Sequence, residues 1–273
     1  MPATNDSTRL LVTGASGQLG QLVLTHLLDT LKVAPERIVA ASRSIDKLQK
    51  FAERGVVTRR ADFNDANTVV EAAQGVDRAL IISTDDFFNR FKGQKIAATA
   101  LAQAGVKHIL YTFLAGSILR NGLYHENALG SIAGAKATGK WLSAAKDGKL
   151  AGLSRDDVAL ANAMALASDN YGENVYELTG VVGVTIDEIA AEISGAIEAP
   201  IEVLHVTVDE RAQSISSATG LPLEMTKGFG SFDTNTAEGC ADVLGDDFFK
   251  LTGKKPQTHA EWAQAHNEML KAI

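Results

Sequence analysis

Three glycines at a spacing of three residues are the clearest chemical signal in the chain. Gly14, Gly17 and Gly20 lie in the segment VTGASGQLG, directly after an apolar run. In a turn from a strand to a helix, such glycines permit the tight turn, the approach of the backbone to a pyrophosphate, and the packing of the helix on the strand. Free N–H groups at the helix start then face the negative charge. The segment therefore predicts a dinucleotide-binding loop, and a merely structural turn is the alternative.

The end of the second predicted strand indicates which dinucleotide would bind. A cofactor without a ribose phosphate is usually held by Asp or Glu about 20 residues beyond the glycines. This strand ends instead in Ala41, Ser42 and Arg43. Arg43 suits a 2′-phosphate, and Lys47, one helical turn later, can reach the same group. We therefore predict a preference for NADPH over NADH, and two solvated surface cations are the alternative.

Two further strand ends are expected to face the cofactor. Asp62 and Phe63 end the third strand, where adenine would lie, although Asp62 could equally cap a helix or form a turn. Ser83 and Thr84 end the fourth strand, beside the expected pyrophosphate and nicotinamide ribose.

The chain lacks the usual patterns of acid–base and nucleophilic catalysis. In short-chain dehydrogenases a Tyr and a Lys four residues apart act on the substrate carbonyl. The residues at that spacing after Tyr111, Tyr124, Tyr171 and Tyr176 are Ala, Ala, Val and Gly. No Gly-x-Ser-x-Gly elbow is present. We therefore predict no catalytic side chain of these kinds, and a reaction that needs little proton transfer from the protein, such as hydride transfer to a quinone or another conjugated electrophile.

Metal chemistry is not predicted. The single cysteine, Cys240, excludes a Cys-based zinc cluster and an internal disulfide, and it favours a reducing compartment. The six histidines are scattered along the sequence. Only His259 and His266 could share a helix face, and solvated surface residues are the more expected interpretation of that pair.

The elements that must position these residues alternate between strand and helix in the first half. The run RLLVTGA is followed by leucines and valines every three or four residues up to Leu31, and the alternation continues to KHILYTF. Gly55, Gly75 and Gly105 are predicted to close three of the helices. Five successive βα units predict an α/β fold with a Rossmann-like, doubly wound parallel sheet.

The second half predicts a smaller α+β lobe on the carboxyl side of that sheet. It contains a helix over 155–167, the strand-like NVYELTG, and capping boxes at Thr185 with Glu188 and Thr258 with Glu261. We predict an NADP-binding domain over residues 1–122, completed by residues 154–180, and a substrate-side lobe over 123–153 and 181–273.

Composition narrows the setting of the protein. The 273 residues are 45% hydrophobic and carry a formal net charge of −7, which disfavours a nucleic-acid partner. No signal peptide or apolar run long enough for a membrane span is visible, so we expect a cytoplasmic protein without a membrane partner.

Several motifs together resemble one protein family. VTGASGQLG, ASRSIDK, ADFND, LIIST, AGVKHILYT, LRNGLYHEN, YELTG and LTGKKPQT are similar to the NmrA-like branch of atypical short-chain dehydrogenases, especially the type 2 NAD(P)H:quinone oxidoreductases and triphenylmethane reductases. The resemblance implies bound NADPH, direct hydride transfer to a quinone, and a homodimer. The cofactor-binding residues are then Gly14, Ser16, Gly17, Gln18, Leu19, Arg43, Lys47, Asp62, Phe63, Ser83, Thr84, Asn121 and Gly122, and the substrate-binding residues are Phe113, Leu123 and Tyr124.

Some of these residues also have plainer interpretations. Phe113 and Tyr124 could be core aromatic residues, and Asn121-Gly122 could be a turn alone.

The chain departs from the family pattern after its fifth strand. The relatives have a helix with a Glu-Lys pair before the LRNG segment, whereas here only four residues separate Phe113 from Ile118. A parallel crossover normally takes a dozen or more residues. We therefore predict that Ile118–Gly122 does not pair in parallel beside Ile109–Phe113. It would instead turn back, stay irregular, or leave that strand position empty.

Two other functions compete with the reductase. A redox sensor that binds NADP(H) without turnover, as other NmrA-like proteins do, would fit the shortened segment and the absent Tyr and Lys. A nucleotide-sugar epimerase is disfavoured by the same absence.

Overall fold

The computed structural model describes residues 7–83, 90–112, 117–170 and 172–273. The chain divides into two compact units. The first comprises residues 1–121, 156–178 and 247–254, and the second comprises 122–155, 179–246 and 255–273. Residues 247–254 thus belong to the first unit, whereas the sequence assigned them to the lobe.

The first unit is built on a parallel sheet of seven strands, in the order β3-β2-β1-β4-β5-β6-β9. The strands are β1 Leu10–Val12, β2 Ile38–Ser42, β3 Val57–Arg60, β4 Arg78–Ile81, β5 His108–Tyr111, β6 Ser117–Asn121 and β9 Val175–Leu178. The α-helices are α1 Gln18–Thr25, α2 Gln49–Ala52, α3 Ala66–Ala72, α4 Arg90–Gln103, α6 Arg155–Ala167 and α10 Asp247–Thr252. The predicted doubly wound α/β fold is confirmed, as are the bounds of the helix over 155–167.

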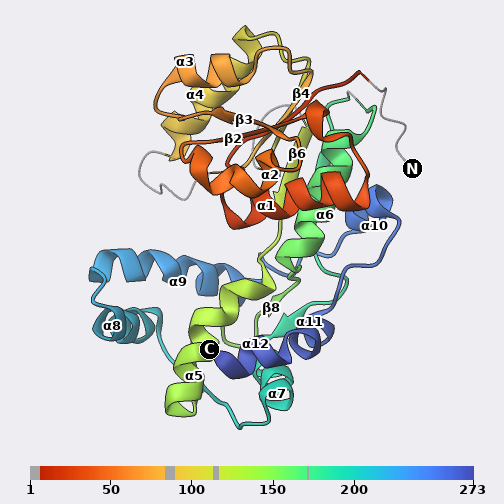
Figure 1. Cartoon of the computed structure of the whole chain (residues 1–273). Helices are drawn as coiled ribbons and strands as arrows, with labels where there is room; N and C mark the ends of the chain where they lie inside the picture. The colour runs from red at the N-terminus through yellow and green to blue at the C-terminus, as the bar shows by residue number, and fades with distance from the viewer. Residues whose placement is uncertain (1–6, 84–89, 113–116, 171) are drawn as a thin grey trace. The chain divides into compact units, whose positions relative to one another are not determined.

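Helices cover both faces of this sheet, with α3 and α4 on one side and α1 and α6 on the other (Figure 1). Residues such as Val69 of α3 and Leu101 of α4 pack against Leu11 and Ile81 of the sheet. Short helical turns complete the unit: a π-helix at His26–Thr30 and 3-10 helices at Pro35–Arg37 and Ile45–Leu48. Gly55, Gly75 and Gly105 have positive φ angles of 91°, 70° and 80°, which confirms the predicted left-handed conformation at these positions.

The prediction that the segment after the fifth strand could not pair in parallel is wrong. β6 pairs in parallel with β5 through Leu110 with Ser117 and Tyr111 with Ile118. The register explains why. β6 begins beside the penultimate residue of β5, so the chain moves back by one residue rather than by the length of a strand, and neighbouring strands are only about 4.8 Å apart. The crossover rule applies to a full return of the chain.

Most of the pairing of β6 is with β9 instead. Four pairs, from Ile118 with Val175 to Asn121 with Leu178, join these two strands in parallel. β6 therefore occupies the sheet position that the sequence left in doubt, although residues 113–116 before it lie outside the described residues.

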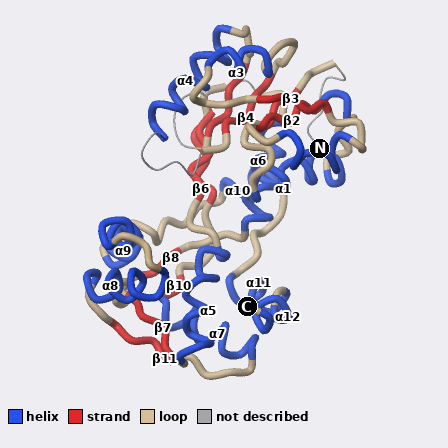
Figure 2. The backbone as a smooth tube through the Cα atoms, turned by 60° about the vertical axis from the view of Figure 1, so that its left-hand side comes forward, coloured by secondary structure: helices blue, strands red, loops and turns tan. Residues whose placement is uncertain are grey.

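The second unit packs helices against two short pairs of strands (Figure 2). Its helices are α5 Leu129–Thr138, α7 Ile186–Ile197, α8 Val208–Thr219, α9 Leu223–Ala237, α11 His259–Ala265 and α12 Asn267–Ala272, with a 3-10 helix at His125–Ala128. Its strands are β7 Lys140–Ser143, β8 Lys149–Leu150, β10 Val184–Thr185 and β11 Glu202–His205. β7 pairs in parallel with β11, and β8 pairs antiparallel with β10. The fully buried Trp262 lies in a core that includes Ile132, Ile189 and Ile193.

Candidate functional site

The turn between β1 and α1 has the geometry expected of a dinucleotide-binding loop. Gly14 has a φ of 61°, in the region that favours glycine. The turn is fixed by hydrogen bonds from the N–H of Gly17 to the carbonyl of Gly14 and from the N–H of Thr13 to the carbonyl of Leu80, each 3.0 Å long. The backbone of Gly14 and Gly17 is exposed at the surface of the first unit.

Gly20 allows the helix to approach this turn closely. A Cβ atom at this position would overlap the carbonyl oxygen of Gly14 and lie 2.7 Å from the Cα of Ala15. A side chain larger than hydrogen would therefore push α1 away from the loop. This confirms the packing role that the glycine spacing predicted.

The start of α1 has no protein cap. Its N-cap, Gly17, has no side chain, and no side-chain hydrogen bond caps the helix. Within the described part of the chain, no acceptor faces the N–H groups of Gln18 and Leu19. The side chain of Leu19 itself is buried, so this residue can offer a ligand only its backbone. These open donors and the positive end of the helix dipole form a site suited to an anion.

The end of β2 lies directly beside the turn. The N–H of Ala15 donates to the carbonyl of Ala41 at 3.0 Å, and the hydroxyl oxygens of Ser16 and Ser42 share a hydrogen bond of 2.6 Å. Ser42 also accepts a hydrogen bond of 3.2 Å from the N–H of Ser44. The glycine loop and the strand end that carries Arg43 are therefore one connected structure.

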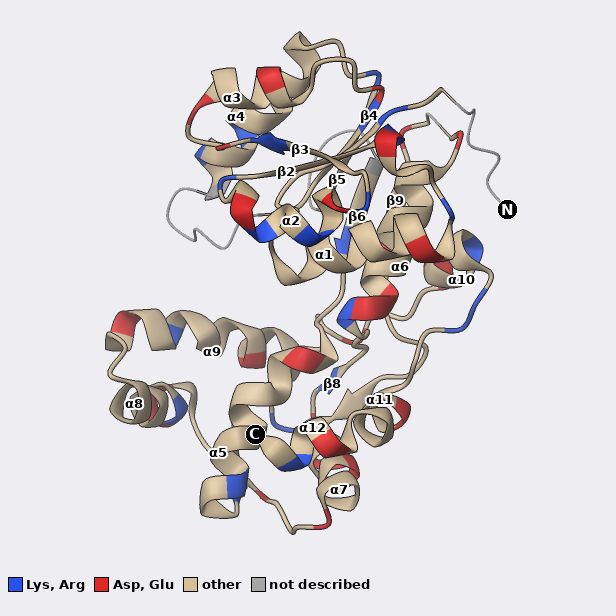
Figure 3. Ribbon diagram, in the orientation of Figure 1, with Lys and Arg blue, Asp and Glu red and all other residues tan. Residues whose placement is uncertain are grey.

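Arg43 and Lys47 are both exposed. Among the described residues, neither the guanidinium of Arg43 nor the ammonium of Lys47 has an ion-pair or hydrogen-bond partner. Figure 3 shows other Lys and Arg residues interspersed with Asp and Glu along the helices. Two cations without a protein partner next to an anion-binding turn fit a phosphate group.

The residues at the ends of the next two strands have protein contacts of their own. Asp62 accepts a hydrogen bond of 3.0 Å from the N–H of Asn64, so its carboxylate forms a turn, as one of its two predicted roles required. Phe63 packs against the core between the sheet and its helices. Ser83 accepts a hydrogen bond of 2.9 Å from the side chain of Gln94. Thr84 lies outside the described residues.

Of the predicted substrate-binding residues, Leu123 and Tyr124 lie in the second unit. Phe113 lies outside the described residues, and Asn121 is the last residue of β6 in the first unit. Gly122, Leu123 and Tyr124 belong to the second unit. There the N–H of Leu153 donates to the carbonyl of Leu123, and the guanidinium of Arg155 lies 5.4 Å from the centre of the Tyr124 ring.

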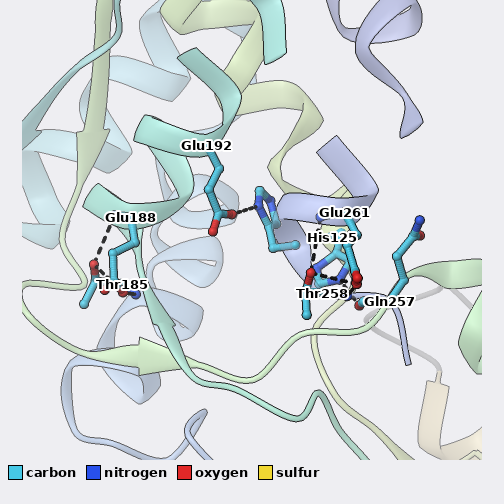
Figure 4. Close-up of polar contacts among 8 residues, drawn as sticks. His125, Thr185, Glu188, Glu192, Gln257, Thr258 and Glu261 are labelled. Carbon is cyan, nitrogen blue, oxygen red and sulfur yellow. Dashed lines mark hydrogen bonds and ion pairs between the residues drawn. The ribbon is translucent and has the colours of Figure 1, made fainter. Parts of the chain in front are cut away.

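Two histidines that are distant in sequence, His125 and His259, are in contact in the second unit, and the expectation that His259 is a solvated surface residue is wrong. The rings of His125 and His259 are 5.0 Å apart and nearly perpendicular, and both residues are buried. His259 also contacts Trp262 and pairs with Glu192 at 2.7 Å, as Figure 4 shows for the labelled Glu192. The ring of His266 contacts the ring of Trp262 on the same helix face.

Burial controls the protonation of this cluster. Burial lowers the pKa of His259 to about 4, and burial together with the neighbouring His259 lowers the pKa of His125 to about 4. Burial raises the pKa of Glu192. The contact between His259 and Glu192 is therefore a hydrogen bond from a neutral imidazole at neutral pH rather than an ion pair. Among the described residues, no group of three or more His, Cys, Asp or Glu side chains could hold a metal ion.

The first unit alone fits a dinucleotide that carries a ribose phosphate. It combines exposed glycine backbone, open N–H donors at the start of α1, close packing of that helix through Gly20, and two cations without partners in the described part of the chain.

The comparisons agree on one family. A model of the NmrA-like family matches residues 6–117. Quinone oxidoreductase 2 of Escherichia coli strain K12 is 35% identical over 211 residues, which cover 68% of this chain and 73% of that protein. The crystal structure of an NADPH-dependent quinone oxidoreductase from Escherichia coli, complexed with NADPH, has a TM-score of 0.88 and 29% identity, covering 94% of this chain and 99% of that one. The Citrobacter sp. triphenylmethane reductase complexed with NADP(H) has a TM-score of 0.86 and 26% identity, with coverage of 94% and 99%.

The fold and these relatives place the chain among the Rossmann-fold oxidoreductases. More narrowly, the chain belongs to the NmrA-like family, which confirms the resemblance seen in its motifs. No helix in the described part of the chain is long and apolar enough to cross a membrane.

Proposed function

We propose that the protein is an NADPH-dependent reductase that transfers a hydride directly to a quinone or a similar conjugated acceptor. The observation that carries this proposal is the open start of α1 beside Arg43 and Lys47, which have no partners among the described residues. The relatives support the acceptor class, because they include quinone oxidoreductase 2 of Escherichia coli and a triphenylmethane reductase of Citrobacter sp..

The residues of the first unit divide the cofactor between them in this proposal. The N–H groups at the start of α1 hold the pyrophosphate, and Arg43 with Lys47 holds the 2′-phosphate. Phe63 and Asp62 lie on the adenine side. Ser83, Thr84, Asn121 and Gly122 lie on the side of the nicotinamide ribose. A hydrogen bond to a charged group contributes about 1.5–3 kcal/mol, so each phosphate contact is worth roughly ten- to hundredfold in affinity.

The chemistry requires little proton transfer from the chain. When bound, NADPH supplies the hydride, and a conjugated acceptor is already electrophilic. The absence of a Tyr-x-x-x-Lys pattern in the sequence agrees with a reaction of this kind. Phe113, Leu123 and Tyr124 are the residues that we propose to contact the acceptor, since aromatic and aliphatic side chains suit a flat conjugated ring.

The test is NADPH consumption with a simple benzoquinone and a simple naphthoquinone. The near-ultraviolet absorbance of NADPH, which is lost on oxidation, measures that consumption. We expect turnover with both acceptors and faster turnover with NADPH than with NADH. No turnover across a broad quinone panel would contradict the proposal. Tight NADP(H) binding by calorimetry in that case would favour the redox sensor instead.

We further propose that the protein is a cytoplasmic homodimer. A single cysteine suits a reducing compartment. Light scattering during size-exclusion chromatography would measure the mass in solution, and a monomeric mass at micromolar concentration would contradict the dimer.

A further inference from the structure

A buried hydroxyl lies between the glycine loop and the cations of the first unit. Ser42, the last residue of β2, is 6% exposed. Its Oγ atom lies 2.6 Å from the Oγ atom of Ser16 and accepts a hydrogen bond of 3.2 Å from the N–H of Ser44. Arg43 is the residue between Ser42 and Ser44. The Ser42 hydroxyl therefore lies next to Arg43 of the proposed phosphate site and also contacts Ser16 of the glycine loop.

Counting hydrogens gives the bond between Ser42 and Ser16 a direction. A serine hydroxyl has one hydrogen to donate and two lone pairs to accept. The Ser42 oxygen already accepts from Ser44, and among the described residues only Ser16 lies within reach of the Ser42 hydrogen. If Ser16 donated to Ser42, the hydrogen of the buried Ser42 hydroxyl would have no acceptor, which is unfavourable. Ser42 therefore donates to Ser16.

This direction leaves the hydrogen of Ser16 available to a ligand. Ser16 is only half-buried, and Ser42 is its one hydroxyl partner among the described residues. Successive hydrogen bonds polarise one another, so the chain from the Ser44 N–H through Ser42 makes Ser16 a stronger donor. A phosphate group accepts hydrogen bonds and donates none when ionised, so it is the natural recipient.

We propose that Ser42 is a positioning residue for NADPH selectivity, because it orients the Ser16 hydroxyl to donate to the 2′-phosphate next to Arg43. The proposal rests on the proposed function, since it requires a phosphorylated adenine nucleotide at this strand end. It assigns a role to a buried residue that the glycine pattern and the cations do not include. NADH has no phosphate at that position, so the same hydroxyl adds little to its binding.

The experiment uses two nucleotides that differ only by that phosphate. Calorimetry would give the dissociation constants of adenosine 2′,5′-bisphosphate and adenosine 5′-monophosphate for the full chain, for Ser42→Ala, for Ser16→Ala and for the double variant. Ser42→Thr, which keeps a hydroxyl, is the matched control. Neither nucleotide can be reduced, so the measurement does not depend on turnover.

Ser16→Ala loses a hydrogen bond to a charged group, so we expect its affinity for the bisphosphate to fall about tenfold or more. Ser42→Ala keeps the Ser16 hydroxyl without its orientation, and we expect a loss of about three- to tenfold that Ser42→Thr largely avoids. Affinity for the monophosphate should stay within about twofold in each variant. The double variant should bind the bisphosphate as Ser16→Ala does, because Ser42 acts through Ser16.

Three results would overturn the inference. Ser42→Ala could bind the bisphosphate as tightly as the unaltered chain does, or it could weaken the binding of both nucleotides equally. The loss of bisphosphate affinity caused by Ser42→Ala could also stay the same when Ser16 is already alanine. Each of these would leave the proposed reductase intact. If the unaltered chain bound the bisphosphate no more tightly than the monophosphate, the NADPH assignment and this inference would both fall.

Discussion

Helix α1 of the first unit and three helices of the second unit begin in opposite ways. Three helices of the second unit, α7, α8 and α11, begin with capping boxes, in which a threonine and a glutamate satisfy the open N–H groups on both sides. Figure 4 shows the residues of two of them, Thr185 with Glu188 and Thr258 with Glu261. The backbone hydrogen bonds also lower the pKa of these glutamates. By contrast, α1 of the first unit begins at a bare glycine with no side-chain cap.

The difference separates a structural helix start from one that is available to a ligand. A capping box leaves fewer free donors for a ligand, because side chains of the protein already accept the hydrogen bonds of two N–H groups and place a carboxylate at the helix start. Within the first unit, α3 is also closed, since Asp65 accepts from the N–H of Asn67. The open start of α1 thus differs from the capped start of α3 in the same unit. The contrast can be tested in four ways: by capping the start of α1, by protonating the buried histidines near the capped start of α11, by removing Arg43, and by removing the cap of α7.

The largest effect is expected from giving α1 the cap that it lacks. The φ of −75° and ψ of 167° at Gly17 suit an N-cap of any residue type, and a Cβ atom there would lie 3.3 Å from the carbonyl oxygen of Gly14, which requires a small shift of the turn. We expect Gly17→Asp to lower NADPH affinity at least about a hundredfold, because its carboxylate would occupy two donors and repel the pyrophosphate. The free protein should become about 0.5 kcal/mol more stable. Calorimetry and urea unfolding would measure the two changes.

Gly17→Asn is the matched control for charge, because it can cap the helix without a carboxylate. Its loss of affinity should be clearly smaller than that of Gly17→Asp. If Gly17→Asp bound NADPH as tightly as the unaltered chain, the open start would not be the pyrophosphate site.

The stability of the second unit, which holds the buried His125 and His259, should depend on pH rather than on the nucleotide. The folded pKa values of His125 and His259, about 4, lie below the ordinary value of 6.5. Below pH 6.5 these histidines are therefore protonated in the unfolded chain but not in the folded chain. The free energy of unfolding falls as the pH is lowered toward 4. Each histidine contributes up to about 3 kcal/mol to this loss.

Urea unfolding between pH 7 and 4 would measure the pH slope of stability. His259→Gln can still donate a hydrogen bond to Glu192 but cannot be protonated, so we expect a shallower slope than in the unaltered chain. An equal slope in His259→Gln would show that the buried imidazole does not control acid stability.

Much of this contrast could be predicted from the sequence, because its signals are local. The glycine spacing predicted the open turn, and Thr185 with Glu188 predicted a closed helix start, since each pattern lies within a few residues. The capping box of Thr207 and Glu210 has the same pattern and could have been found in the same way.

The errors concern contacts between distant segments. The parallel pairing of β6 depends on a register that begins beside the end of β5, and no local pattern encodes that register. The contact between His125 and His259 joins the 3-10 helix at His125–Ala128 to α11, so neither sequence neighbourhood indicates it. The short β7, Lys140–Ser143, pairs with β11 more than 50 positions away, and it was missed for the same reason.

Removal of Arg43 should reduce the preference of the first unit for NADPH over NADH. Arg43 has no partner among the described residues, whereas Arg54 pairs with Asp29. We expect Arg43→Ala to lower the ratio of NADPH to NADH affinity about ten- to hundredfold, because one charged hydrogen-bond donor to the phosphate is lost. Arg54→Ala, on the surface of the same unit, should leave the ratio unchanged. An unchanged ratio in Arg43→Ala would contradict the assignment of the 2′-phosphate, and Lys47→Ala should have the same direction with a smaller effect.

The smallest expected effect comes from opening a helix start that is now closed. In Thr185→Ala the Glu188 N–H loses the hydroxyl that accepts its hydrogen bond at 3.2 Å, and we expect the free energy of unfolding to fall by about 1 kcal/mol. Thr185→Ser keeps the hydroxyl and should lose much less. NADPH affinity should be unchanged in both variants, because an open helix start binds the dinucleotide only together with the glycine backbone and the cations of the first unit. If Thr185→Ala weakened NADPH binding as strongly as it weakened folding, the capped helix would take part in the binding site, and the division between open and closed helix starts would no longer separate ligand binding from stability.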